Sequence, residues 1–182
     1  MPHFSYAVTN SGRGGGDIDR ETLSIEAAKA ASLMALISTE YTRYKLSDGP
    51  PRLTAGGFTT LCTTPTGSNS CLWYFRPQLP TSINLMGTVY NVLAINNGRR
   101  VNGLGTTDDE ALVFLEDLPP ALCEEINRQL GFDTVPENSS LSFPSSIINL
   151  PSYQGEVTMC FTNPDSGGSD PDNVYYYAVN VK

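Results

Sequence analysis

The feature that most restricts the fold is one long amphipathic helix predicted near the N-terminus. Asp19 is placed to cap its start, and Gly49, Pro50 and Pro51 mark its end. Between these signals apolar residues recur every three or four positions, so they share one face. A helix over residues 20–48 is roughly 43 Å long and needs a sheet or neighbouring subunits along which to lie. This apolar face is the candidate assembly surface of the helix, with a core face as the alternative, and it consists of Leu23, Ala27, Ala30, Met34, Ile37, Tyr41 and Tyr44.

The segment before this helix is predicted to be a flexible tail or linker over residues 1–18. It contains the glycine-rich run Gly12–Gly16, a composition typical of flexible chains. A phosphate-binding loop would require a Lys-Ser/Thr pair after the glycines, and none follows them. The length of the remainder suits one domain, so residues 19–182 are expected to fold as a single unit.

Most of that domain is predicted to be β-sheet. Short runs rich in β-branched and aromatic residues are separated by clusters of Gly, Pro, Asn and Ser. The Asn97-Gly98 step between two such runs is a strong hairpin signal. Strands are expected at residues 58–62, 72–75, 86–95, 99–104, 155–161 and 174–181.

Two short additional helices are predicted among the strands. Residues 107–110 have the form of a capping box before the apolar run 111–115. Pro119 or Pro120 opens a second helix, which continues to Leu130. The order is a long helix, then strands with small helices, then a final hairpin, which is not an alternating βαβ order. We therefore expect an α+β fold in which the long N-terminal α-helix packs on an antiparallel β-sheet.

The four cysteines indicate disulfides and therefore an extracellular or periplasmic location. No pair has the spacing of a zinc site, and the single histidine, His3, lies in the predicted tail. An even count without metal-type spacing favours disulfides in an oxidising compartment. Of the three pairings we favour Cys62–Cys71 and Cys123–Cys160. Four free buried thiols in a cytosolic protein are the alternative.

The charge of the chain argues against nucleic acid as a partner. Eleven basic and nineteen acidic residues give a net charge of −8, which repels nucleic acid and anionic lipid. The sequence has no run of the roughly 18 apolar residues that a membrane span requires, and its start lacks the features of a signal peptide. Since export is indicated, we expect this to be a trimmed or mature chain.

Enzymatic chemistry is not expected. His3 is the only histidine and lies in the predicted tail, so a nucleophile activated by an imidazole base is not expected. A carboxylate pair, as in glycoside hydrolysis, could come from Asp108, Asp109, Glu110, Glu116, Asp117, Glu124 and Glu125. Because those residues stand at predicted helix starts and on exposed helix faces, capping and the helix dipole explain them more simply. A secreted hydrolase is the alternative.

The best ligand candidate is the acidic segment 165–173. Its carboxylates, carboxamide and backbone carbonyls are the hard oxygen donors that calcium prefers, although the spacing is not that of an EF-hand. A solvated turn, in which Asp and Asn serve the backbone, is the alternative. No other cofactor is expected. The calcium hypothesis uses Asp165, Asp170, Asp172 and Asn173.

Two further features are candidates for surface contacts. Tyr175, Tyr176 and Tyr177 lie in a predicted strand, so Tyr176 faces the opposite side from the other two. One side is expected to be core and the other a contact surface. Asn138-Ser139-Ser140 matches the N-glycosylation sequon, a pattern that is frequent by chance.

The order of elements and two local segments resemble type IV pilins and pseudopilins. The segments are residues 12–21, before the long helix, and residues 103–106 followed by 118–131. In that family a Pro-x-x-Cys-x-x-Ile-Asn helix, here residues 120–127, carries half of the C-terminal disulfide, which implies Cys123 with Cys160. The resemblance implies a structural subunit of a pilus or pseudopilus filament that associates with itself or with other pilin-like subunits.

The sequence departs from the family pattern at its start. Family members begin with a short leader, a cleavage site and an apolar helix half with a glutamate, and none of these is present. The resemblance therefore implies membrane contact only through a missing N-terminal segment. Some pseudopilins hold calcium in a C-terminal loop, which the acidic segment resembles in position. The alternative function is a secreted adhesin-like module that binds a ligand through the acidic loop or the tyrosines.

Overall fold

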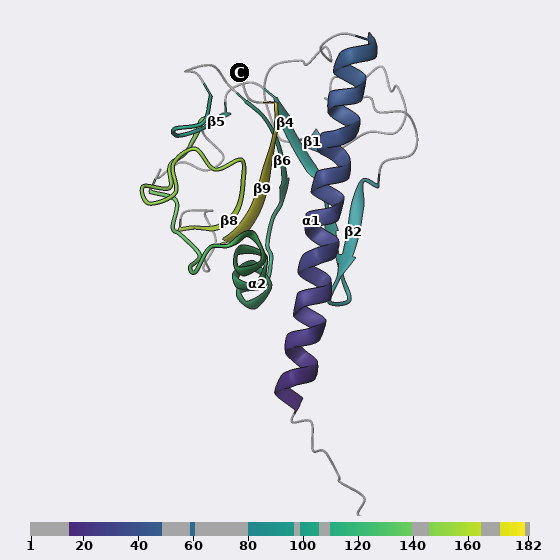
Figure 1. The fold of residues 1–182 in the computed structure, drawn as a ribbon, viewed down its shortest axis with the longest axis vertical. Coiled ribbons are helices and arrows are strands. Elements are labelled where there is room, and N and C mark those ends of the chain that lie inside the picture. Colours follow the sequence, from purple (N-terminus) through teal and green to yellow (C-terminus); the bar gives the residue numbers. More distant parts are fainter. Residues whose placement is uncertain are drawn as a thin grey trace, which may run out of the picture.

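The computed structural model describes residues 15–48, 59–60, 80–96, 99–105, 110–139, 146–164 and 172–180. It has the predicted α+β class, with a long N-terminal helix lying against an antiparallel sheet (Figure 1). The elements in chain order are α1 (Gly15–Asp48), β1 (Thr59–Thr60), β2 (Ser82–Leu85), β3 (Thr88–Asn91), β4 (Leu93–Asn96), β5 (Arg99–Val101), β6 (Ala111–Leu115), α2 (Pro120–Leu130), β7 (Ser146–Ile148), β8 (Thr158–Asn163) and β9 (Asp172–Asn180).

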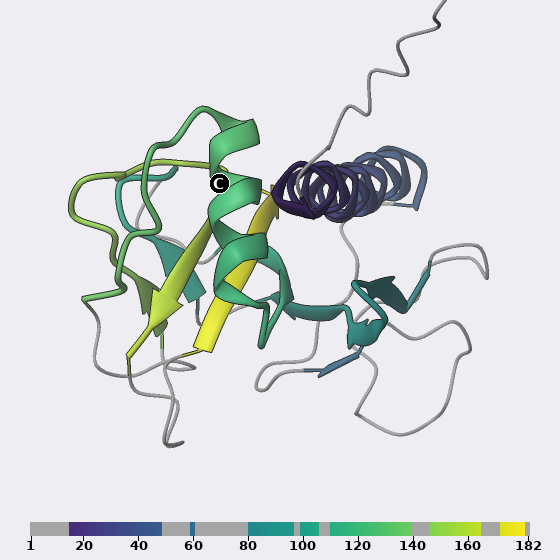
Figure 2. The same ribbon diagram turned by 90° about the horizontal axis from the view of Figure 1, so that it is seen from below.

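The main sheet has five strands in the order β1-β4-β6-β9-β8, and all neighbours are antiparallel. The predicted final hairpin is confirmed, since β8 pairs with β9 from Thr158 opposite Tyr177 to Asn163 opposite Asp172. Strands β2 and β3 form a separate hairpin, while β5 and β7 form a short parallel pair. Helices α1 and α2 lie side by side on one face of the main sheet (Figure 2).

Helix α1 is longer than predicted and has 34 residues. It begins at Gly15, so residues 15–18 belong to the helix and not to a tail. Each glycine costs about 1 kcal/mol relative to alanine in a helix, a penalty that cooperative extension from the strong segment behind it can offset. The end at Asp48 agrees with the predicted end. The first turns extend beyond the sheet (Figure 1).

The predicted apolar face of α1 lies in the core of the domain. The side chain of Leu23 packs at its margin, and that of Tyr44 lies outside the part of the structure that is described. The face contacts α2 and β9, as expected for a helix laid on a sheet. Ala27, Ala30, Met34, Ile37 and Tyr41 are each 2 % exposed or less.

The main sheet is covered on both faces, which the sequence did not indicate. One core lies between the sheet and the two helices and includes Tyr175. The other lies between the opposite face and the segments around β5 and β7, and it includes Phe161 and Tyr176, whose rings meet edge to face at 5.9 Å. The expectation that one side of the tyrosine run is a contact surface is wrong for Tyr175 and Tyr176, since both are buried.

One of the two predicted short helices is correct and the other is a strand. Helix α2 begins at Pro120 and ends at Leu130, and the φ of 90° at Gly131 gives the expected left-handed cap. Residues 111–115 form β6, and all five are fully buried. A continuous apolar run of this length fits a strand buried on both faces as well as a helix turn, and here the strand pairs on both sides.

The predicted strand 86–95 is interrupted, and the hairpin across Asn97-Gly98 is wrong. Met86 and Gly87 form a tight turn with φ of 51° and 82°, which separates β2 from β3. Strand β4 then pairs with β1 and β6, whereas β5 pairs with β7. Long-range pairing therefore overrides the local turn signal. Strand β1 falls within the predicted strand 58–62, and the predicted strand 72–75 lies outside the described residues.

Candidate assembly surface and acidic corner

A disulfide joins α2 to the edge of the main sheet. Cys123 of α2 and Cys160 of β8 are both fully buried, and their Cα atoms are 5.4 Å apart. The bridge spans 37 residues of sequence, and a bridge of this kind contributes about 2–4 kcal/mol to stability. Cys62 and Cys71, the other favoured pair, lie outside the described residues.

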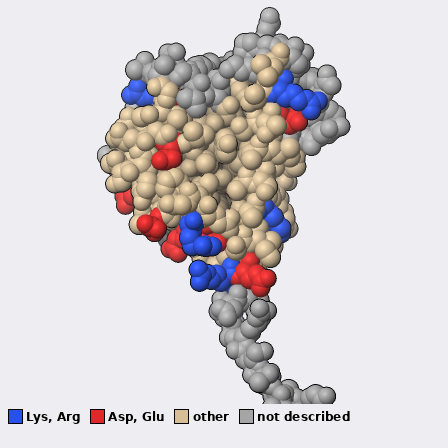
Figure 3. All heavy atoms as spheres, viewed as in Figure 1, with Lys and Arg blue, Asp and Glu red and all other residues tan. Residues whose placement is uncertain are grey.

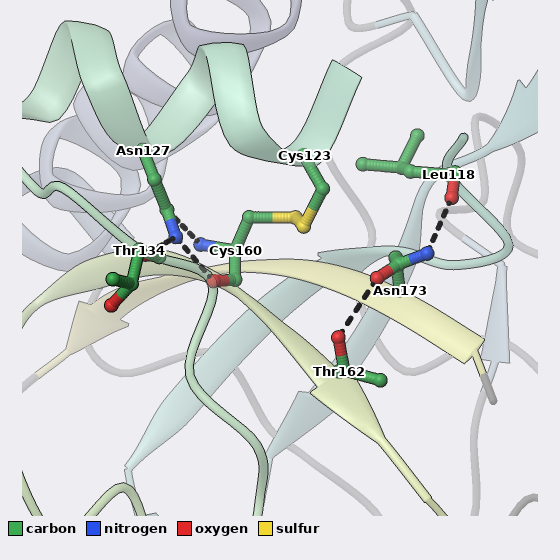
Figure 4. Close-up of a disulfide and its surroundings, with 7 residues drawn as sticks. All are labelled: Leu118, Cys123, Asn127, Thr134, Cys160, Thr162 and Asn173. Carbon is green, nitrogen blue, oxygen red and sulfur yellow. Dashed lines mark hydrogen bonds between the residues drawn. A yellow bond between two sulfur atoms is a disulfide. The ribbon is translucent and has the colours of Figure 1, made fainter. Parts of the chain in front are cut away.

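Asn127 reinforces the same junction through hydrogen bonds. Its Nδ2 donates to the carbonyl oxygen of Cys160 at 2.8 Å, and its Oδ1 accepts from the backbone N–H of Cys160 at 2.8 Å. Nδ2 also donates to the carbonyl of Thr134 at 2.9 Å (Figure 4). The carboxamide therefore serves the edge of β8 as a neighbouring strand would. The local sequence pattern did not predict this role for Asn127, which was noted only as the last residue of the Pro-x-x-Cys-x-x-Ile-Asn segment.

The chain that follows α2 covers another part of the outer edge of β8, at Thr162. The N–H of Thr162 donates to the carbonyl of Pro136, and the N–H of Asn138 donates to the carbonyl of Thr162, both at 2.9 Å. Covering a strand edge in this way prevents pairing with other chains.

The predicted glycosylation sequon at Asn138 is not accessible in the folded protein. Asn138 is fully buried, and its Oδ1 accepts from the N–H of Asn149.

The acidic segment is only partly described, and one of its predicted ligands has a structural role. Asp165 and Asp170 lie outside the described residues. Asn173 is buried, with its Oδ1 accepting from the hydroxyl of Thr162 at 3.0 Å and its Nδ2 donating to the carbonyl of Leu118 at 3.1 Å (Figure 4). The carboxamide of Asn173 therefore fastens the start of β9 to the β6–α2 connection.

Asp172 belongs to an acidic corner that we define by Asp117, Asp172 and Asn163. Asp117 stands in the β6–α2 turn with φ 59°, and burial together with the nearby carboxyl of Asp172 raises its pKa. Asn163 lies opposite Asp172 in the β8–β9 register and is fully buried. Neither polar atom of its side chain has a hydrogen-bond partner among the described residues. A buried carboxamide without partners costs free energy that a bound ligand or water would recover.

Within the described residues the acidic corner is not part of a larger ligand cluster, since no group of three or more His, Cys, Asp or Glu there could hold a metal ion. Of the carboxylates considered for hydrolysis, Asp108 and Asp109 lie outside the described residues. Glu110 precedes β6, is fully buried, and accepts from the N–H of Val101 at 3.0 Å.

A polar contact fixes α2 against α1. The carboxylate of Glu125 accepts from Nε and Nη2 of Arg128 at 2.7 and 2.6 Å and from Nε2 of Gln129 at 3.0 Å. These bonds, those of Arg128 above all, lower the pKa of Glu125 to about 2, although burial opposes the shift. Gln129 also donates to the carbonyl and the hydroxyl of Ser24 on α1 at 2.9 and 3.1 Å.

The outer face of α1, opposite the core, combines exposed apolar and small side chains. Ile25, Leu36 and Leu46 are 52 %, 44 % and 83 % exposed. An open groove between this helix and β2 is lined by Ile25, Ala28, Ser32, Leu33, Pro80 and Ile83. A second groove, between the helix and β9, is lined by Ala35, Ser38, Thr39, Thr42, Leu46 and Tyr177. The described surface of α1 is thus suited to close packing, but through residues other than the predicted stripe.

Comparisons with known proteins identify no family for this chain. No protein-family model matches the sequence, and neither the curated proteins nor the solved structures give a match. In the part of the chain that is described, no helix combines the length and the apolar content needed to cross a bilayer.

Proposed function

We propose that this protein is a structural subunit of an extracellular or periplasmic filament of the pilus or pseudopilus type. The observation that carries the proposal is the outer face of α1. This helix already buries its inner face against its own sheet, yet it exposes Ile25, Leu36 and Leu46 on its outer face. Exposed apolar side chains along one long helix are typical of a surface that packs against other chains.

The shape of the domain and its disulfide support this function. Helix α1 is about 50 Å long at 1.5 Å per residue, and its first turns project beyond the sheet (Figure 1). A projecting helix offers contacts to neighbours on several sides. The Cys123–Cys160 bridge suits the oxidising compartment in which such filaments form.

The surface proposed for assembly differs from the stripe that the sequence suggested. That stripe is core, as the burial of Ala27, Met34 and Ile37 shows. The proposal therefore assigns the subunit contacts to the outer face, where the small side chains of Ala28, Ser32 and Ala35 permit close approach of a second helix.

The experiment is immunogold electron microscopy of cells that express the gene, combined with isolation of the material sheared from their surface. Wild-type protein is expected in thin filaments, and Leu36→Lys is expected to abolish them because it places a charge in the packed face. Val157→Lys is the matched control, since Val157 is also exposed and lies outside α1. Circular dichroism establishes that both variants fold. Wild-type protein found only as dispersed monomers would contradict the proposal.

A second candidate function is a secreted binding module with a calcium site, which the acidic corner favours. Two carboxyls and a buried carboxamide that lacks described partners are oxygen donors of the kind calcium uses. Isothermal titration of the wild-type chain with calcium tests it. Binding that is lost in Asp172→Asn but kept in Asp133→Asn would support the site, and no heat of binding at millimolar calcium would exclude it.

A further inference from the structure

We propose that successive subunits meet head to tail, with the last turns of α1 in one copy seated in a groove beside α2 in the next. The inference rests on the filament function proposed above and names the contact that would propagate it. The inserted part, which we call the knob, is Leu46 with Arg43. The receiving part, which we call the α1–α2 groove, lies at the opposite end of the domain. It is lined by Leu23, Ala121, Glu124, Phe132, Asp133 and Val135.

The α1–α2 groove has an apolar floor and an acidic rim. Leu23, Phe132 and Val135 are partly buried and supply the floor. Glu124 and Asp133 are exposed on the rim, and neither is paired with a cation among the described residues. Glu125, which also lines the groove, is already neutralised by Arg128. The unpaired charge on the lining of the groove is therefore negative.

The knob has the complementary chemistry. Leu46 is 83 % exposed, far more than any other large apolar side chain described. Arg43 precedes it by three positions, so the two side chains lie on neighbouring parts of the helix surface. The guanidinium pairs with Glu40 at 3.3 Å, but an exposed pair of this kind contributes little and can be exchanged. An apolar side chain with an adjacent cation matches an apolar floor with acidic rims.

The geometry makes the partner a second copy of this chain. Leu46 follows Leu23 by 23 positions, which places it about 35 Å away along the axis of α1. The knob and groove of one molecule therefore cannot meet each other. Charged side chains gather toward the two ends of the domain, while the middle of the face is largely uncharged (Figure 3). A contact between two different patches is heterologous and propagates into an open array, as a filament requires.

Charge reversal followed by mixing tests the contact on the whole chain by sedimentation velocity over a range of concentrations. Arg43→Glu and Asp133→Lys are each expected to weaken self-association about tenfold because like charges meet at the rim. An equimolar mixture of the two variants is expected to recover association, since each knob then finds a groove of opposite charge. Glu137→Lys carries the same charge change outside the groove and is expected to associate as the wild type does.

The outcomes separate this contact from the filament function. A mixture that stays monomeric while the wild type associates overturns the contact, as does a wild type that remains monomeric at millimolar concentration. Filaments that form unchanged on cells expressing Arg43→Glu also overturn it, but they leave the proposed function standing. Cross-linking from a photoreactive side chain at position 46 only to a protein other than this chain counts against the contact equally.

Discussion

The side-chain amide of Asn127 holds both backbone groups of Cys160, so a helix residue takes the place of a strand beside β8. The disulfide partner of Cys160 is Cys123, one turn earlier on the same helix. Covalent and polar links between α2 and the sheet are therefore adjacent. The junction closes one edge of the sheet and fixes the position of the helix that borders the proposed groove.

Replacing Asn127 by alanine is expected to destabilise the fold by about 3 kcal/mol, because it leaves the buried backbone groups of Cys160 and the carbonyl of Thr134 without their partner. The free energy of unfolding, measured by urea denaturation, checks the value. Asn84→Ala is the control, since Asn84 is exposed on β2, and it is expected to change stability by less than about 0.5 kcal/mol. Equal effects of the two substitutions would show that Asn127 does not secure the edge.

Removing the disulfide is expected to cost about 2–4 kcal/mol, since the unfolded chain regains the entropy of a loop of 37 residues. The measurement compares thermal and urea unfolding of Cys123→Ala/Cys160→Ala with the wild type. Because both sulfurs are buried, reductant added to the folded wild type is expected to act only as fast as the junction opens. Rapid reduction under native conditions would contradict the burial.

The lowered pKa of Glu125 predicts loss of stability in acid. Its folded pKa of about 2 lies below the ordinary 4.5, so the unfolded state binds the proton more readily between these values. The contribution is fully present above about pH 4.5 and is lost as the pH falls toward 2. Because Arg128 is half exposed, solvent screening reduces the effect to about 1 kcal/mol.

Urea unfolding of the wild type and Glu125→Gln at pH 5, 4 and 3 measures this contribution. The stability gap between the two proteins is expected to narrow as the pH falls. Glu124→Gln, on the exposed side of the same helix, provides the control and is expected to show no such narrowing. A constant gap for Glu125→Gln across this range would show that its carboxylate does not stabilise the folded state through Arg128.

The elements that the sequence predicted well are those with local boundaries. Helix α2 is bracketed by Pro120 and Gly131, and the inner face of α1 is marked by its spacing alone. The final hairpin followed from two β-prone runs around a turn. These signals depend on residues close in sequence, so they do not depend on which distant segments pack against them.

The elements it missed depend on distant partners. Strand β6 is apolar at every position because both faces of the sheet are covered, so its sequence lacks the alternation that marks a half-exposed strand. The segments around β5 and β7 that cover this second face also bury Tyr176. The β2–β3 turn places Met86 at positive φ, where asparagine or glycine is usual, so it gave no turn signal. At the candidate sites, the unsatisfied carboxamide of Asn163 and the grooves beside α1 exist only once the chain has folded.

Two glycines with similar positive φ angles are expected to differ in their tolerance of a side chain. Gly131 has φ 90° and Gly103 has φ 82°, so alanine is strained at either position. At Gly131 no atom lies within 4 Å of the added Cβ, and the cost should be only the conformational penalty of about 1 kcal/mol. At Gly103 the Cβ would lie 2.8 Å from the Cβ of Gln154 and 3.0 Å from the backbone nitrogen of Gly155.

The backbone near Gly103 cannot move freely, because the N–H of Gly155 donates to the carbonyl of Asn102 at 2.9 Å. Gly103→Ala is therefore expected to cost about 3 kcal/mol, since overpacking adds to the strain. Urea denaturation of the two variants beside Gly87→Ala, another open position with positive φ, measures the difference. If Gly103→Ala were no more costly than the other two, the close approach of residues 102–103 to 154–155 would not restrict the backbone at Gly103.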